Sequence, residues 1–232
     1  MKTVVVTGGS GGIGSQICKT FAQEGYKVAL IYNTNLQKAQ QLEKSGVKIY
    51  QTDITNEESV ISAFDKVRGE LGKISILINC AGISIKGLFQ LCTTEDFDKI
   101  FGVNVKGAFN CSKQVISDML ELEGGDIINI SSIWASRPAS CEVLYSATKG
   151  AINSLTISLA DELRFSNIKV NAISPGFVDT PMNSGLSKEE VEDFLAENGL
   201  KRVVTSEEIA QKCLEIILQD KSGQIYEIFG KV

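Results

Sequence analysis

Histidine does not occur anywhere in the 232 residues of this chain. Its absence excludes a Ser-His-Asp catalytic triad and the common zinc sites that are built on histidine. Any proton transfer must therefore use tyrosine, lysine, aspartate, glutamate, serine or cysteine side chains. We accordingly expect no metal site.

The chain also has no block of basic residues, and its formal net charge is −5. A nucleic-acid-binding surface needs clustered lysine and arginine, so we expect no nucleic-acid partner. The first apolar run, residues 3–6, is far too short for a signal peptide or a membrane span. Six cysteines are scattered without a C-x-x-C pair, which is typical of reduced core residues. Together these features predict a cytoplasmic protein without a membrane partner.

Short apolar runs alternate with stretches of helical periodicity along the chain. The expected strands are residues 3–6, 27–32, 47–51, 74–78, 126–130, 169–174 and 224–229. This alternation predicts an α/β fold: a single-domain, doubly wound parallel sheet of about seven strands with helices on both faces, the Rossmann fold, over residues 1–232. The polar stretch 183–205, interrupted by glycine, predicts a flexible flap over the substrate rather than core.

Two long helices carry specific expectations. Residues 93–122 read as one helix, bent near Gly102, with Phe109 on its packed face. Asn104 interrupts an apolar part of that helix and must bond to backbone or to ordered water. The helix of Tyr145 has an apolar stripe at four-residue steps: Ala147, Ala151, Leu155, Leu159 and Leu163. Ile152 lies outside that stripe, which predicts a partner helix and hence a homo-oligomer, a dimer or a tetramer.

Glycines cluster where the first strand turns into the first helix, in Thr7-Gly-Gly-Ser-Gly-Gly-Ile-Gly14. At such a turn, glycine lets the backbone approach a ligand, and the helix N-terminus offers free N–H groups to a pyrophosphate. A strand, a glycine turn and a helix at the start of a βαβ unit predict dinucleotide binding.

Residues at the end of the second strand bear on the choice of dinucleotide. An acidic residue there would favour NAD, and a basic one would favour NADP. Tyr32 and Asn33 are both neutral, and Lys38 is the nearest cation. The choice stays open from the residues, with NADP(H) slightly favoured over NAD(H).

Polar residues follow the other strands at the same expected edge of the sheet. Asp53 could accept a hydrogen bond from an adenine amino group, or it could cap the helix that follows. Asn79-Cys80-Ala81-Gly82 and Ser131-Ser132 end two later strands. Ligands of doubly wound sheets lie at these carboxyl ends.

Tyr145 and Lys149 are four residues apart, so on a helix they share one face. A nearby ammonium favours the phenolate and would make the tyrosine a general acid or base near neutral pH. The plainer interpretation is a half-buried tyrosine beside a surface lysine, because such pairs are common.

Taken together, these motifs resemble the short-chain dehydrogenase/reductase family over essentially the whole chain. Thr7-Gly8-x-x-x-Gly12-Ile13-Gly14 resembles its cofactor turn, and Asn79-x-Ala81-Gly82 and Pro175-Gly176 follow in the family's order. The thirteen-residue interval from Ser132 to Tyr145 is one that the family commonly shows. Within the family, the chain is most similar to 3-oxoacyl-(acyl-carrier-protein) reductases.

The resemblance implies roles for particular residues. The implied catalytic residues are Ser132, Tyr145, Lys149 and Asn104. Tyr145 would protonate the carbonyl oxygen, Lys149 would lower the tyrosine's pKa and hold the ribose, and Ser132 would donate to the substrate oxygen. Asn104 would hold a water that links Lys149 to solvent. The implied cofactor contacts are Gly8, Ser10, Gly12, Ile13, Gly14, Asn33, Asp53, Ile54, Asn79, Ala81, Gly82, Tyr145, Lys149, Pro175, Gly176, Val178 and Thr180.

The implied activity is hydride transfer between NAD(P) and a carbonyl or secondary alcohol, on a small-molecule or acyl-thioester substrate. Alternatives are a sugar or small-alcohol dehydrogenase of the same family and, in a different class, a catalytically silent dinucleotide-binding regulator. A basic patch for an acidic carrier protein would favour the 3-oxoacyl thioester, and Arg137, Lys201 and Arg202 are the candidates. Gly11 stands where NADP-using relatives often have a basic residue, which weakens the case for NADP.

Overall fold

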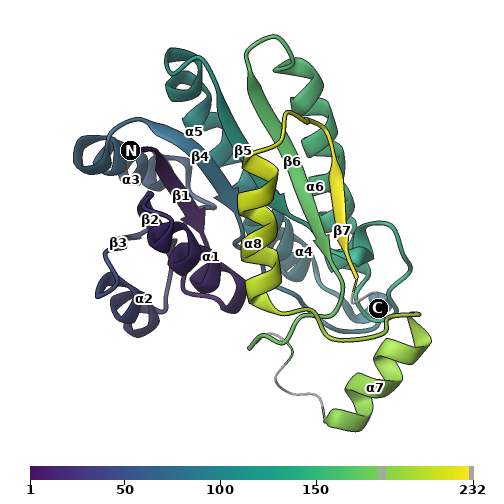
Figure 1. The fold of residues 1–232 in the computed structure, drawn as a ribbon. Coiled ribbons are helices and arrows are strands. Elements are labelled where there is room, and N and C mark those ends of the chain that lie inside the picture. Colours follow the sequence, from purple (N-terminus) through teal and green to yellow (C-terminus); the bar gives the residue numbers. More distant parts are fainter. Residues whose placement is uncertain (182, 184–186, 230–232) are drawn as a thin grey trace.

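Seven parallel strands form one sheet in the order β3-β2-β1-β4-β5-β6-β7 in the computed structural model (Figure 1). The structure describes residues 1–181, 183 and 187–229. The strands are β1 (Thr3–Thr7), β2 (Lys27–Tyr32), β3 (Lys48–Gln51), β4 (Ile74–Asn79), β5 (Gly125–Ile130), β6 (Ile168–Pro175) and β7 (Ile225–Ile228). The predicted doubly wound parallel sheet is confirmed.

Helices cover both faces of the sheet, and alternate strand residues point to opposite faces, so each strand contributes to two buried clusters. In β1, Val4 and Val6 pack in one buried cluster and Val5 in another. The first cluster includes residues of α1 (Gly12–Gln23), α2 (Leu36–Glu43) and α8 (Ser206–Ile217). The second includes residues of α3 (Glu57–Leu71), α5 (Gly107–Glu121) and α6 (Val143–Glu162).

The order of the strands places a crevice at the carboxyl edge of the sheet. From β1 the chain runs outward through β2 and β3, and it then returns to β4 on the other side of β1. The connections after β1 and β4 therefore diverge, and ligands of open α/β sheets bind at such a switch point.

The predicted helix 93–122 consists of three joined segments. They are α4 (Thr94–Phe101), a π-helix η2 (Gly102–Lys106) and α5. The change of helix type begins at Gly102, where the bend was expected. The predicted packed face of this helix was wrong for Phe109, which is 50% exposed. Ala108, Ser112, Val115 and Met119 are buried on that face.

The predicted apolar stripe on α6 was wrong in part: Leu163 is buried and Leu159 packs against the core, whereas Ala147 is exposed. The buried positions within α6 are Leu144, Thr148, Lys149, Ile152, Thr156 and Ala160. Polar residues can occupy this face because the Thr148 and Thr156 hydroxyls donate to the carbonyls of Tyr145 and Ile152, at 2.7 and 2.8 Å. Since Ile152 packs inside its own chain, it gives no support for a partner helix.

The predicted flap 183–205 contains α7 (Lys188–Glu197) and is partly core. Leu200 and Val204 are buried, and the Phe194 ring contacts the rings of Trp134 and Phe177 at 5.5 and 5.1 Å between centroids. Positions 184–186 of the predicted flap lie outside the described residues. No helix in the described ranges is long and apolar enough to cross a membrane.

Candidate active site

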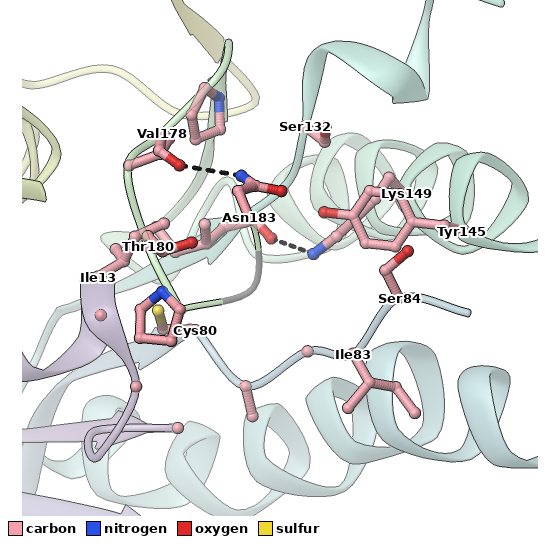
Figure 2. Close-up of a pocket in the computed structure, with 18 of the residues that line it drawn as sticks. Ile13, Cys80, Ile83, Ser84, Ser132, Tyr145, Lys149, Val178, Thr180 and Asn183 are labelled. Atoms are coloured by element: carbon pink, nitrogen blue, oxygen red, sulfur yellow. Dashed lines mark hydrogen bonds between the residues drawn. The ribbon is translucent and has the colours of Figure 1, made fainter. Parts of the chain in front are cut away.

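A cavity of about 1050 Å³ opens at the carboxyl edge of the sheet and contains most of the predicted site. One end is lined by the glycine turn after β1 and by the ends of β2 and β3. The other end is lined by the segment after β4, the start of α6 and part of α7. Figure 2 shows Tyr145, Lys149 and Ser132 facing the loop that carries Val178, Thr180 and Asn183 across the cavity.

The glycine turn fits the expected pyrophosphate site. Gly8 has a φ of +64°, a backbone conformation that glycine adopts without strain. A Cβ added at Gly14 would lie 2.4 Å from the Gly8 carbonyl oxygen, so the turn and α1 touch directly. Gly11, the N-cap of α1, gives no side-chain cap, which leaves the first N–H groups of the helix for a ligand. Gly8, Ser10, Gly12, Ile13 and Gly14 all line the cavity.

The ends of β2 and β3 line the same end of the cavity with Asn33, Lys38, Asp53 and Ile54. The Asp53 carboxylate accepts from the backbone N–H and the hydroxyl of Thr55, at 2.9 and 2.8 Å. Asn56, rather than Asp53, caps α3 by accepting from the Ser59 N–H at 2.8 Å. The helix-capping alternative for Asp53 is therefore wrong, and its second oxygen faces no described donor.

Of the predicted residues at the end of β4, some line the cavity and one points into the core. Ala81 and Gly82 line the cavity, and the Thr7 hydroxyl holds this segment by accepting from the N–H groups of Cys80 and Ala81. Asn79 does not line the cavity. Its amide donates instead to Ser112 and Asn129 behind the sheet end, at 3.0 and 2.9 Å.

The loop after β6 covers the glycine turn. Pro175, Gly176, Val178 and Thr180 line the cavity, and a Cβ added at Gly12 would lie 3.0 Å from the Thr180 side chain. Sequence reasoning missed Asn183, whose amide donates to the Val178 carbonyl at 2.9 Å and lies inside the cavity (Figure 2). No strand end or motif marked Asn183, because its position depends on how the loop folds back.

Lys149 and Tyr145 lie together on the wall of the cavity, as their spacing predicts. The Lys149 ammonium donates to the Ile130 carbonyl at 2.8 Å and lies 5.5 Å from the centre of the Tyr145 ring. Lys149 is only 6% exposed, and burial lowers its pKa to about 8.

The expected fall in the pKa of Tyr145 is wrong for this arrangement. Burial raises the pKa of the phenol above its usual value, and this effect outweighs the hydrogen bond with Ser132, which lowers it. The negative charge of Glu142 raises the same pKa further. Tyr145 is therefore protonated at neutral pH in this arrangement, and burial makes it a weaker acid than a free phenol.

Asn104 lies behind this pair, in the π-helix, and is 2% exposed. Its amide oxygen accepts from the Ile83 N–H at 2.8 Å, and its amide nitrogen donates to the Ile83 carbonyl and to Thr148. The Thr148 hydroxyl donates in turn to the Tyr145 carbonyl. Asn104 thus fixes the segment after β4 against the helix that carries Tyr145, and it does not itself line the cavity.

Further lining residues at the end of the cavity beside Tyr145 were missed, among them Ser84, Trp134, Glu142, Phe177 and Phe194. Glu142 is the N-cap of α6, three residues before Tyr145, and this closeness in sequence could have identified it. Arg137 and Arg202, proposed for a carrier patch, are engaged inside the chain with the Asn198 carbonyl and with Glu208. Within the described ranges, no cluster of three or more His, Cys, Asp or Glu could hold a metal ion.

Comparisons with known proteins agree with this geometry. The sequence model of the short chain dehydrogenases matches residues 2–191. The chain is 34% identical to an acetoacetyl-CoA reductase of Rhizobium meliloti, over 97% of this chain and 93% of the relative. It is 33% identical to a 3-oxoacyl-(acyl-carrier-protein) reductase of Thermotoga maritima, over 99% and 96% of the two chains.

The fold is also similar to that of a solved structure, a 3-ketoacyl-(acyl-carrier-protein) reductase from Brucella melitensis complexed with NADH. The TM-score is 0.92 at 28% sequence identity, and the match covers 99% of this chain and 97% of the other.

Proposed function

The chain belongs to the short chain dehydrogenases, and from this membership we propose that it reduces a ketone of the 3-oxoacyl type to the secondary alcohol. It is an NAD(P)-dependent oxidoreductase that acts on carbonyl or CH–OH groups, like the relatives it matches. The observation that carries the proposal is the convergence of Ser132, Tyr145 and Lys149 on the cavity that begins at the glycine turn.

We propose the following roles in the reduction. When bound, the reduced nicotinamide supplies a hydride to the ketone carbon. The Tyr145 phenol, which is protonated at neutral pH, donates its proton to the ketone oxygen. The Ser132 hydroxyl donates to the same oxygen as negative charge develops on it. Lys149 holds the ribose, and Asn104 positions the helix of Tyr145 through Ile83 and Thr148.

The substrate class is tested by comparing the reduction of a 3-oxoacyl thioester with the oxidation of alcohols. With NADPH, we expect the neutral N-acetylcysteamine thioester of 3-oxobutanoate to be reduced. Its kcat/KM should be at least about tenfold above that for oxidation of polyols or small secondary alcohols with NADP⁺. Faster oxidation of a polyol would instead support the sugar or small-alcohol dehydrogenase.

We propose that NADPH is preferred over NADH. The support is local: the segment 33–38 after β2 lines the cavity with Asn33 and Lys38 and contains no acidic residue, so the carboxylate at this end is Asp53 after β3. Lys38 is exposed, so its attraction for a phosphate is screened by solvent.

Substituting Lys38 with alanine is expected to weaken NADPH binding by about fivefold and to leave NADH binding unchanged, because only NADPH carries the extra phosphate. Fluorescence titration of both nucleotides measures this difference. Lys44→Ala is the matched control, since Lys44 caps the end of the same helix outside the cavity. Equal losses for both nucleotides would count against a phosphate contact at Lys38.

We propose a homo-oligomer, a dimer or a homotetramer, and a cytoplasmic location. Several large apolar side chains of α4, α5 and α6 are exposed, as a face that meets a second copy would be. They are Phe97, Phe109, Leu120, Val143 and Ile157. All six cysteines are free thiols, which suits a reducing compartment.

A further inference from the structure

A carboxylate lies in the part of the cavity left for the substrate. Glu142 comes immediately before α6 and lines the cavity three residues ahead of Tyr145. Both Glu142 and Tyr145 line this cavity. The charge of Glu142 acts on the phenol, since it raises the pKa of Tyr145. A substrate whose ketone reaches Tyr145 therefore lies within the electrostatic influence of Glu142.

Ser84 holds this carboxylate in place. The Ser84 hydroxyl donates to Oε1 of Glu142 at 2.7 Å, and both residues line the cavity. Figure 2 shows Ser84 beside the Tyr145 ring, on the segment that follows Ile83. This segment is itself fixed by Asn104, which bonds both backbone groups of Ile83. One oxygen of Glu142 is thus oriented by the protein, and the other faces no described donor.

No described cation neutralises Glu142. It forms no ion pair, although Lys86 lines the cavity nearby, two residues after Ser84. On the opposite side, α7 adds Glu190 and Glu197 to the lining. Glu190 caps α7 through Ser187, whereas Glu197 has no described partner. Around Tyr145 the lining thus has three carboxylates, Glu142, Glu190 and Glu197, and two ammonium groups, Lys86 and Lys149.

We propose that Glu142 selects a ketone whose attached chain carries an ammonium group. This inference rests on the proposed reductase function and adds the charge of the substrate. An ammonium that extends past Tyr145 would meet an oriented carboxylate that lacks a cationic partner, and a charged hydrogen bond is among the stronger polar contacts. An anionic chain, such as one that ends in a carboxylate, would place like charges together and be rejected.

The test uses three amides of 3-oxobutanoate that share one reacting ketone and differ in the charge at the end of the chain. They are the cationic 2-aminoethyl amide, the neutral ethyl amide and the anionic glycine amide. We expect kcat/KM with NADPH to fall in that order, with the cation at least about tenfold above the anion. Because the ketone is identical in all three, the order reports the charge alone.

Glu142→Gln removes the charge and keeps the shape of the side chain. We expect the cation-to-anion ratio to fall to below about threefold in this variant. Glu192→Gln is the matched control, since it removes one charge from α7 outside the cavity and should keep the ratio. Ser84→Ala leaves the carboxylate in place and should keep a preference for the cation.

Three results would overturn the inference. The cation could be no better than the neutral amide, the ratio could survive in Glu142→Gln, or it could fall equally in Glu192→Gln. If no amide were reduced while the N-acetylcysteamine thioester still was, this inference would fail and the proposed 3-oxoacyl function would stand; if the thioester were not reduced either, both would fail. NADPH binding by each variant establishes that the fold is intact.

Discussion

Replacing Tyr145 with phenylalanine is expected to lower kcat by about a thousandfold and to leave NADPH affinity nearly unchanged. The ring stays in the cavity wall, and only the hydroxyl that holds the proton is lost. Burial raises the pKa of this hydroxyl, so in the wild type the proton is present throughout the neutral range and is available to the ketone oxygen.

The measurement is single-turnover oxidation of bound NADPH, with affinity taken from a separate fluorescence titration. Tyr50→Phe is the matched control, because the Tyr50 hydroxyl donates to Glu70 at 3.2 Å outside the cavity. The control should keep wild-type turnover. A loss of less than tenfold in Tyr145→Phe would mean that another group supplies the proton.

Gly14→Ala is expected to weaken binding of either dinucleotide by at least about a hundredfold, because the backbone of the glycine turn must come close to the pyrophosphate. The new Cβ would lie 2.4 Å from the Gly8 carbonyl oxygen and 2.9 Å from the Gly9 Cα. Both contacts are backbone, so the turn itself must open. At Gly12, by contrast, a Cβ would meet the Thr180 side chain at 3.0 Å. Gly12→Ala should therefore have a smaller effect, since a side chain on a loop can move aside.

Fluorescence titration measures the affinities, and circular dichroism verifies that the sheet is retained. Gly69→Ala in the exposed part of α3 is the control, because its Cβ meets nothing within 4 Å. It should raise the free energy of unfolding by about 0.5–1 kcal/mol and leave binding unchanged. A Gly14→Ala protein with a native spectrum and wild-type affinity would show that the turn does not approach the cofactor.

The strands could be predicted closely because parallel strands are buried on both faces and appear in the sequence as unbroken apolar runs. The predicted range 27–32 coincides with β2, and 74–78 falls short of β4 only by Asn79. The buried faces of the helices were harder to predict from the sequence. On α6 the buried positions include Thr148 and Thr156, whose hydroxyls donate to backbone carbonyls. A prediction that places only apolar residues on the buried face misses them.

The sequence also could not predict the direction in which a side chain points at the end of a strand or in a loop. Asn79 stands at a strand end, as a cofactor ligand would, but its amide points toward Ser112 and Asn129. The pKa of Tyr145 depends on burial, which no spacing reveals. Asn183 reaches the cavity only because its loop folds back over it.

The π-helix between α4 and α5 limits how this chain can change in length. A π-helical turn holds one residue more than an α-helical turn, and each residue of a helix advances the chain by about 100°. Losing one residue from Gly102–Lys106 would restore a regular helix and rotate α4 against α5. Asn104 would then turn away from Ile83, and the start of α6 would lose its anchor. A surface loop tolerates such a deletion, whereas this segment does not, because it anchors the start of α6 and its Val103 lines the cavity.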